Sequence, residues 1–330
     1  MSALEDKFSR TLNYLRLSVT DRCNLRCNYC MPEEGIQFEP RTELLTYEEI
    51  IHLAKLLKTQ GLNKIRITGG EPFVRKDLDK LLRALRFDVG IEKLHITTNG
   101  TLTLPYIDLL KEIEIDSVNL SLDTLRKDRF FQITRRDKFT EVWGVMEKIL
   151  KAGIKTKINV VVQKGVNEDE IIPFVQLAHY KPIDVRFIEA MPFNGINNNK
   201  NDHFISYESI LNTILTAYPS ANQINPLSNS SAVEFAIPRF KGSFSVIPAF
   251  SRTQCGTCNR LRLSATGELR TCLYADSVTN LRDLMRNGAS NDELLKSVSD
   301  SVKTKAINGF EAEAERKNKV ISESMVSIGG

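Results

Sequence analysis

The sequence predicts an α/β fold: an incomplete (β/α)6-type TIM barrel followed by a smaller C-terminal α+β domain. Three observations support this prediction. Between residues 14 and 188, short apolar runs typical of strands alternate with longer helical patterns, and serial βα units form parallel sheets with right-handed crossovers. Several of these strands carry polar residues at every second position. Two groups of three cysteines stand far apart in the 330-residue chain.

The expected elements of the barrel follow one another in βα order. The expected strands are 14–20, 64–68, 94–98, 117–122, 155–162 and 184–188. The expected helices between them are 46–60, 76–85, 104–112, 140–152 and 168–178. Thr46, with Glu49 three residues later, predicts a capping box at the start of the first helix, and Gly61 predicts its end.

The pattern changes after residue 188. An asparagine-rich loop covers 194–201, and residues 222–231 have the Asn/Ser/Pro composition of a linker. We therefore expect one domain over residues 1–225 and a second over 226–330. In the second domain we expect short strands at 234–237, 243–247, 259–264 and 268–272, a hairpin turn at Thr266-Gly267, and helices at 280–285 and 292–304.

Five of the expected strands carry polar side chains on one face. The residues that alternate in this way are Arg16 and Ser18; Lys64, Arg66 and Thr68; His95 and Thr97; Asn119 and Ser121; and Lys157, Asn159 and Gln163. Residues two apart in a strand point to the same side of the sheet, whereas buried parallel strands are usually apolar throughout. One such strand would suit a solvated sheet face. Five in series favour a polar, cationic lumen, which in an α/β barrel opens at the carboxyl ends of the strands.

The composition, with 42% apolar and 26% charged residues and a net charge of +4, is that of an ordinary globular chain. The basic residues are spread along the sequence, which argues against a nucleic-acid-binding tail and leaves room for a local phosphate pocket. No apolar run approaches the ~18 residues of a membrane span, and the start of the chain has no targeting pattern. Six cysteines in this context indicate metal or redox chemistry, so we expect a cytoplasmic location.

Cys23, Cys27 and Cys30 form a C-x₃-C-x₂-C spacing directly after the first strand. Three thiolates from one short loop bind three irons of a four-iron cluster and leave the fourth iron open for a substrate or cofactor. A structural zinc site needs four closed ligands, and the nearest candidates, His52 and Glu33, complete no familiar spacing. The spacing therefore favours a [4Fe-4S] cluster over zinc.

Cys255, Cys258 and Cys272 form a second triplet, spaced C-x₂-C-x₁₃-C. A zinc ribbon would place another C-x₂-C pair or two histidines here, but no histidine follows His203. The six cysteines thus divide into two triplets with none left over. This division predicts a second cluster with its own open iron.

Gly69-Gly70-Glu71-Pro72 directly follows the second strand. Paired glycines let a backbone approach a ligand closely, and exposed backbone groups pair with the ammonium and carboxylate of an amino acid. A GGEP motif alone usually marks a plain turn. Its place after the strand that follows the first triplet makes it a candidate ligand site.

Together these motifs resemble the radical S-adenosylmethionine (SAM) enzymes, and within them the GTP 3′,8-cyclase (MoaA) family of molybdenum cofactor biosynthesis. Four stretches carry the resemblance: residues 14–22 before the first triplet, 65–72 after it, the block 255–272, and the Gly329-Gly330 terminus. The similarity runs from about residue 10 to the final glycines. Only the highly charged stretch 311–321 carries no matching motif.

The resemblance implies a lyase with two [4Fe-4S] clusters that uses SAM as cofactor and GTP as substrate. In this family, reductive cleavage of SAM gives a 5′-deoxyadenosyl radical that abstracts the ribose 3′ hydrogen of GTP. The product is (8S)-3′,8-cyclo-7,8-dihydroguanosine 5′-triphosphate. By analogy, the cluster on the first triplet binds SAM and the cluster on the second binds the guanine of GTP.

The resemblance also implies the contacts and partners. The positions that match SAM contacts are Tyr29, Gly70, Ser121 and Met191. Those that match GTP contacts are Arg16, Arg66, Thr97, Lys157, Arg260 and Arg262. Cations are natural partners for a triphosphate with about four negative charges. We further expect the Gly-Gly tail to reach the active site, and the enzyme to act as a homodimer with an electron-donor protein upstream and cyclic pyranopterin monophosphate synthase as the next enzyme.

Two other functions stay open at this stage. Another radical SAM enzyme with an auxiliary cluster, such as a peptide-modifying maturase, usually carries more than three C-terminal cysteines. A zinc-stabilised nucleic-acid-binding protein would have bound zinc and a clustered basic stripe. The arginine pair Arg260 and Arg262 favours a phosphorylated substrate over a peptide.

Overall fold

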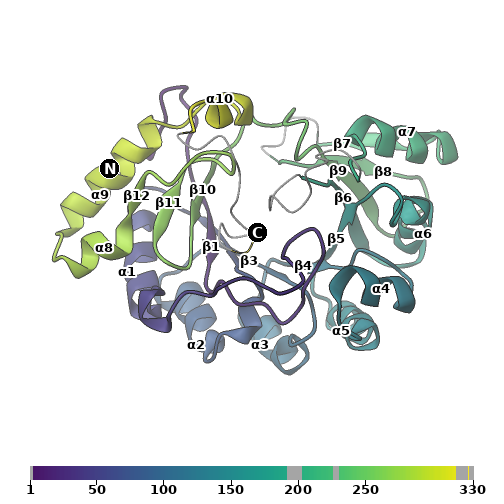
Figure 1. Ribbon diagram of the computed structural model, residues 1–330, viewed down its shortest axis with the longest axis horizontal. Coiled ribbons are helices and arrows are strands. Elements are labelled where there is room, and N and C mark those ends of the chain that lie inside the picture. Colours follow the sequence, from purple (N-terminus) through teal and green to yellow (C-terminus); the bar gives the residue numbers. More distant parts are fainter. Residues whose placement is uncertain (1–2, 192–202, 226–229, 317–325, 327–330) are drawn as a thin grey trace.

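A computed structural model describes residues 3–191, 203–225, 230–316 and 326. One curved sheet surrounds a central space, and the helices lie around its outside (Figure 1). The expected α/β fold class, with a sheet dominated by parallel strands, is confirmed.

Six parallel strands form the middle of the sheet, in sequence order. They are β1 (Tyr14–Ser18), β2 (Lys64–Thr68), β3 (Lys93–Thr98), β4 (Ser117–Ser121), β5 (Thr156–Val162) and β6 (Ile183–Glu189). The helices predicted between them are α1 (Tyr47–Lys58), α2 (Leu78–Arg83), α3 (Ile107–Glu112), α5 (Phe139–Lys151) and α6 (Ile171–Tyr180). The capping box on Thr46 is confirmed, since Glu49 donates its N–H to the Thr46 hydroxyl and its carboxylate accepts from the Thr46 N–H.

The C-terminal strands extend the sheet at both of its edges. β9 (Ser243–Ile247) adds in parallel to β6, and β10 (Arg260–Leu263) adds in parallel to β1. Beyond them lie antiparallel strands: β8 (Val233–Ala236) and β7 (Asn222–Ile224) on one side, β11 (Glu268–Arg270) and β12 (Thr279–Asn280) on the other. β9 and β10 are neighbours in sequence but lie at opposite edges, so residues 248–259 cross from one edge to the other.

Several elements depart from the sequence prediction. Residues 222–224 of the expected linker form β7, because β8 supplies backbone partners for them. Three helices were not predicted: α4 (Lys127–Thr134), α7 (Tyr207–Ala217) and α10 (Gly309–Ala314). α8 (Leu281–Arg286) and α9 (Asn291–Lys303) lie where helices were expected. No described helix has the length and apolar character needed to cross a membrane. The division at residue 225 stays a prediction.

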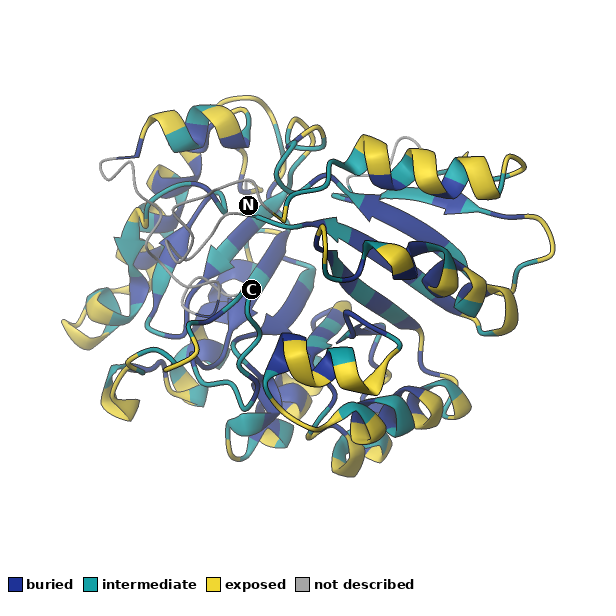
Figure 2. Ribbon diagram, turned by 45° about the vertical axis from the view of Figure 1, so that its right-hand side comes forward, coloured by how far each residue is buried: buried dark blue, intermediate teal, exposed yellow. Residues whose placement is uncertain are grey.

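The two faces of the sheet differ in polarity. Ile65 and Ile67 of β2 are fully buried beneath the outer helices, while Arg66 between them points inward. One apolar core joins β1–β3 to the C-terminal part, since Leu261 of β10 and Val298 of α9 belong to it. Figure 2 shows the buried strands and the exposed outer faces of the helices. The sheet thus buries its apolar face outward against helices and keeps its polar face for the interior.

Candidate active site

A single cavity of about 650 Å³ lies inside the curved sheet and brings together the residues that the sequence singled out. All six cysteines line it, as do all ten predicted ligand-binding residues: Tyr29, Gly70, Ser121, Met191, Arg16, Arg66, Thr97, Lys157, Arg260 and Arg262. Ser18 and Gln163, which were expected on the same polar face, do not line it. Both cysteine triplets therefore face one chamber.

The loop that carries the first triplet is held by α4. The N–H of Arg26 donates to the Thr134 carbonyl at 3.0 Å, and the N–H of Asn28 donates to Ile133 at 2.9 Å. Within the loop, the N–H of Cys30 donates to the Cys27 carbonyl at 3.0 Å and closes a tight turn. This anchoring fixes three thiols on one wall of the cavity. The helix at 127–134 that provides it was not predicted from the sequence.

The paired glycines pack against the backbone of the residues that lead into this loop. A Cβ on Gly70 would lie 2.4 Å from the Arg22 carbonyl oxygen, and one on Gly69 would lie 2.6 Å from that of Thr20. The N–H of Gly70 donates to the Thr20 carbonyl and the N–H of Glu71 donates to the Arg22 carbonyl, both at 2.8 Å. The close approach that requires glycine is thus to the protein's own backbone, although Gly70 also lines the cavity.

The second triplet comes from two segments. Cys255 and Cys258 lie in the crossing segment 248–259, where the N–H of Cys258 donates to the Cys255 carbonyl at 3.1 Å. Cys272 follows β11, which is paired with β10. The ammonium of Lys305, which is 2% exposed, donates to the Thr271 carbonyl and, at 3.2 Å, to that of Arg260. Lys305 thereby ties together the backbone next to Cys258 and Cys272.

The two triplets differ in their electrostatic surroundings. Burial raises the pKa of Cys23 to about 11 and that of Cys30 to about 12. Burial also acts to raise the pKa of Cys258, but the positive charges of Arg260 and Lys305 outweigh it and lower that pKa to about 6. The second triplet therefore lies in the more cationic environment.

All six cysteines are free thiols in the structure. Within the described ranges, no three His, Cys, Asp or Glu side chains converge on the position of one metal ion. A zinc ion needs its ligands about 2.0–2.3 Å away. A four-iron cluster binds each thiolate through a different iron, so its thiolates stand farther apart.

Positive charges crowd the cavity between the triplets. Burial and then the neighbouring Arg262 lower the pKa of Arg16 to about 9, and burial and then Arg186 lower that of Lys157 to about 8. Burial followed by Arg260 lowers the pKa of Arg262 to about 10. These shifts mean that the cations destabilise one another until an anion enters.

Tyr14 lies among the same cations. Its hydroxyl accepts a hydrogen bond from Arg66 Nε at 2.8 Å. Burial would raise the pKa of Tyr14, but the charges of Arg66, Arg16 and Arg260 outweigh it and lower that pKa to about 7. The phenol oxygen thus carries part of the countercharge in this part of the wall.

Two of the predicted SAM contacts have polar partners within the cavity wall. The Tyr29 hydroxyl donates to Asp123 Oδ2 at 2.8 Å, and the Met191 sulfur accepts from the Tyr274 hydroxyl at 3.3 Å. Ser121 is the last residue of β4. These contacts fix the orientation of the side chains; the assigned roles stay predictions.

Sequence reasoning missed Arg186 and Asp123. Arg186 of β6 lines the cavity and pairs with Asp184 at 2.6 Å. Residues 184 and 186 alternate as on the other strands, so the same pattern would have found Arg186. Asp123 follows β4 and gives no local signal. The Gly329-Gly330 tail and residues 317–321 of the charged stretch lie outside the described residues, but Val326 is 2% exposed and lines the cavity.

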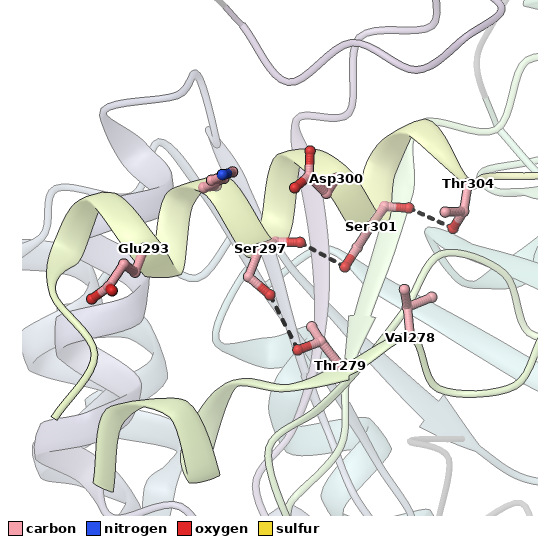
Figure 3. A pocket seen from close by; sticks show the side chains of 8 residues that line it. Val278, Thr279, Glu293, Ser297, Asp300, Ser301 and Thr304 are labelled. Atoms are coloured by element: carbon pink, nitrogen blue, oxygen red, sulfur yellow. Dashed lines mark hydrogen bonds between the residues drawn. The ribbon is translucent and has the colours of Figure 1, made fainter. Parts of the chain in front are cut away.

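A second hollow, of about 430 Å³, lies on the outer surface beside α9 (Figure 3). Its hydroxyl groups bond to their own surroundings: Ser297 donates to Thr279 Oγ1 at 3.1 Å, and Ser301 donates to the Ser297 carbonyl at 2.7 Å. None of the predicted ligand-binding residues lies in it. We assign no function to this hollow.

Comparison with known proteins places two family models on the chain. The model of the Radical SAM superfamily matches residues 17–178, and that of Molybdenum Cofactor Synthesis C matches residues 183–310. Among solved structures, SuiB of Streptococcus suis superposes with a TM-score of 0.61 at 14% identity, over 91% of this chain and 68% of that one. At that identity the similarity concerns the fold alone.

Three relatives illustrate the sequence similarity. The GTP 3′,8-cyclase of Desulforamulus reducens is 39% identical over 98% of this chain and 99% of its own length. The mitochondrial GTP 3′,8-cyclase of Arabidopsis thaliana is 40% identical over 99% of this chain and 83% of its own. Molybdenum cofactor biosynthesis protein 1 of Mus musculus is 43% identical over 91% of this chain but 47% of its own length. The chain spans about half the length of such longer relatives.

Proposed function

This chain belongs to the radical SAM family of GTP 3′,8-cyclases, and from that membership we propose that it converts GTP into 3′,8-cyclo-7,8-dihydro-GTP in molybdenum cofactor biosynthesis. One observation carries the proposal: two separate thiol triplets and a set of cationic side chains line one cavity. A chemistry that needs two clusters and an anionic nucleotide in one chamber fits this arrangement.

The residues present fit the implied groups. Cys23, Cys27 and Cys30 would hold one [4Fe-4S] cluster, and Cys255 with its two partners would hold the other. Each triplet supplies three thiols, so each cluster keeps an iron for a ligand in the cavity. When bound, the clusters and SAM supply the radical hydrogen abstraction at the ribose 3′ carbon that starts the cyclisation.

The protein's own residues bind and orient the substrate. Arg16, Arg66, Lys157, Arg260 and Arg262 would bind GTP, since their mutual repulsion is relieved by the charges of a triphosphate. The cavity is enclosed by the sheet, so charge interactions there are stronger than in water. Tyr29, fixed by Asp123, would contact the adenine of SAM. Holding both reactants in one geometry is the main contribution of such a site to the rate.

The alternatives are less well supported. A peptide-modifying maturase would not need the cations that line this cavity, and the structural similarity to SuiB extends to the fold alone. A zinc-stabilised nucleic-acid-binding protein is disfavoured because its basic residues would form a surface stripe, whereas these cations line the cavity. The phosphate-binding chemistry of the lumen favours the cyclase.

The partners follow from the chemistry of the reaction. The radical step needs an electron, so an electron-donor protein acts upstream. The product would pass to cyclic pyranopterin monophosphate synthase, and by family analogy the enzyme would be a homodimer. The free thiols suit a reducing compartment such as the cytoplasm.

The test is an anaerobic incubation of the purified protein with SAM, GTP and a strong reductant, with products identified by mass spectrometry. We expect the cyclised nucleotide and 5′-deoxyadenosine in equal amounts, and about eight irons per chain, four for each cluster. Bound zinc without visible absorption, or GTP recovered unchanged beside cleaved SAM, would refute the proposal.

A further inference from the structure

His95 lines the cavity, and the proposed function assigns it no ligand. It is the third residue of β3, and its register partners are Arg66 on β2 and Ser117 on β4. Residues that pair in register on neighbouring strands share a face, so His95 stands between a predicted GTP contact and a serine. The side chain lines the cavity together with Thr97, two residues along the same strand.

The two ring nitrogens of His95 have different surroundings. Nδ1 lies 2.8 Å from the Ser117 hydroxyl. Nε2 is shielded from solvent and has no hydrogen-bond partner among the described residues. The same holds for Arg66 Nη1 on β2 and Thr97 Oγ1 on β3. Buried polar groups normally have a partner, so three unpaired groups on two adjacent strands of a cavity wall indicate a ligand.

The charges around His95 keep it neutral. Lys64 and Arg66 of β2, Lys157 of β5 and Arg186 of β6 face it. The nearby carboxylate of Asp184 already pairs with Arg186 at 2.6 Å and lies 3.8 Å from Lys157, while Glu234 lies 3.6 Å from Arg186. Burial, followed by these cations, lowers the pKa of His95 to about 2. The ring therefore contributes one N–H and one lone pair, without a charge.

The contact with Ser117 decides which nitrogen carries the proton. In the described part of the chain, Nδ1 is the one hydrogen-bond partner of the Ser117 hydroxyl, which is buried. If that hydroxyl donates to Nδ1, its proton is satisfied and the ring proton sits on Nε2. The unpaired nitrogen of this cavity-lining side chain is then a donor, as is the unpaired Nη1 of Arg66 on the neighbouring strand.

We propose that His95 is an uncharged hydrogen-bond donor to the phosphate end of GTP, with Ser117 holding its ring in the required tautomer. This assignment rests on the proposed function. A triphosphate has more oxygens that accept hydrogen bonds than it has negative charges. A neutral donor can bind such an oxygen without adding to the repulsion among the cations of the cavity wall. Arg66 on β2 and Lys157 on β5 flank β3 and β4 in the sheet, so we expect the phosphates rather than the base near His95.

Two matched substitutions separate this role from a structural one. In His95→Gln the amide nitrogen replaces Nε2 and keeps a donor at the place of the unpaired nitrogen, but the contact with Ser117 is lost. In His95→Asn the amide replaces Nδ1 and keeps the contact with Ser117, but the donor is lost. GTP affinity is measured by calorimetry on anaerobic enzyme with both clusters, in the absence of SAM so that no turnover occurs.

We expect His95→Asn to weaken GTP binding by about ten-fold or more and His95→Gln by less than about three-fold, because the lost bond is one to a charged acceptor. Guanosine, which lacks phosphates, should bind all three proteins alike. The reverse order of the two variants, or an equal loss for guanosine, would overturn the assignment. Failure of the wild-type enzyme to bind GTP would instead refute the proposed function and this assignment with it.

A pH series tests the neutral state. If His95 stays uncharged, GTP affinity of the wild type and of His95→Gln changes in parallel between pH 6 and 8.5. A wild type that gains affinity relative to His95→Gln as the pH falls would mean that the ring takes up a proton with the nucleotide. That result would overturn the uncharged-donor assignment.

Discussion

The ammonium of Lys305 is buried against the carbonyl of Thr271, the residue directly before Cys272. Lys305 also reaches the Arg260 carbonyl at 3.2 Å, so one side chain joins the backbone next to Cys258 to the backbone next to Cys272. A lysine that is 2% exposed stands out, because lysine is almost never fully buried without a partner. Its position gives the first prediction.

Lys305→Met should release the second cluster. The substitution removes the donor that the carbonyls of Thr271 and Arg260 share, at a cost of about 1–3 kcal/mol. We expect the iron content to fall from about eight towards about four per chain, together with a lower melting temperature. Lys303→Met is the matched control, because Lys303 lies near the end of α9 with a side chain 66% exposed. Equal iron content in the two variants would contradict this role of Lys305.

The two triplets should be separable by single substitutions. Cys27→Ser is expected to abolish formation of 5′-deoxyadenosine from SAM while GTP still binds. Cys258→Ser should have the opposite effect: GTP affinity falls, and SAM is still cleaved. Each variant should lose about four irons. If either one lost both activities while keeping the other cluster, the assignment of one ligand to each cluster would be wrong.

Arg262→Ala should weaken GTP binding by about 10–100-fold, since it removes a charge-assisted contact to a phosphate or base. The iron content should not change, because Arg262 is not a cluster ligand. Lys148→Ala, on the exposed face of α5, removes a positive charge far from the cavity and serves as the control. Unchanged GTP affinity in Arg262→Ala would remove this residue from the binding site.

Lys157 predicts a pH dependence of GTP binding. Burial and Arg186 lower its pKa to about 8 in the free protein. Below pH 8, Lys157 is charged before and after binding; above it, the neutral amine must take up a proton when the triphosphate arrives. Affinity should therefore fall as the pH rises from 8, by at most about ten-fold per pH unit for one proton.

Lys157→Arg isolates this effect, because a guanidinium stays charged across the whole range. The ratio of wild-type to variant affinity should be constant below pH 8 and decline above it. Calorimetry between pH 7 and 9.5 measures this ratio. A constant ratio throughout would show that Lys157 does not titrate in the free enzyme.

Gly70→Ala should disturb the SAM site more than the GTP site. Its Cβ would lie 2.4 Å from the Arg22 carbonyl, so the loop that leads into the first triplet must move. We expect at least ~10-fold weaker SAM binding, with GTP affinity retained. Gly144→Ala is the control, because a Cβ there meets nothing within 4 Å and alanine favours a helix. Normal SAM binding in Gly70→Ala would mean that this backbone contact does not position the cofactor.

The parts of this structure that depend on local pattern were predictable from sequence. The six parallel strands, the cationic face and both cysteine triplets follow from period-2 alternation and spacing, which involve residues near one another in the chain. α4 was missed because its sequence is short and charged, and it is stabilised by the triplet loop that packs on it. The burial of Lys305 could not be predicted either, because a lysine among polar residues normally lies on the surface. Its burial is explained by its contacts with carbonyls from segments distant in sequence.

The sequence predicted that Gly69 and Gly70 are crowded, but the atoms that crowd them differ from those expected. Sequence reasoning expected Gly69 and Gly70 to admit a ligand. In the structure, the atoms that leave no room for a side chain are carbonyls of Thr20 and Arg22. The protein's own backbone is therefore the reason that these positions need glycine, and the loop also lines the cavity. Sequence alone does not distinguish these two sources of crowding.

The attachment of β9 and β10 to opposite edges of the sheet has a consequence for biosynthesis. Until the ribosome has released the chain past residue 247, β6 exposes an unpaired edge, and β1 does so until residue 263 has emerged. Such an edge is a template for aggregation. Iron delivered before Cys272 has emerged would meet a complete first triplet and an incomplete second triplet. Maturation of the two metal centres should therefore be sequential, and a chain truncated near residue 240 should form insoluble material rather than a half-active enzyme.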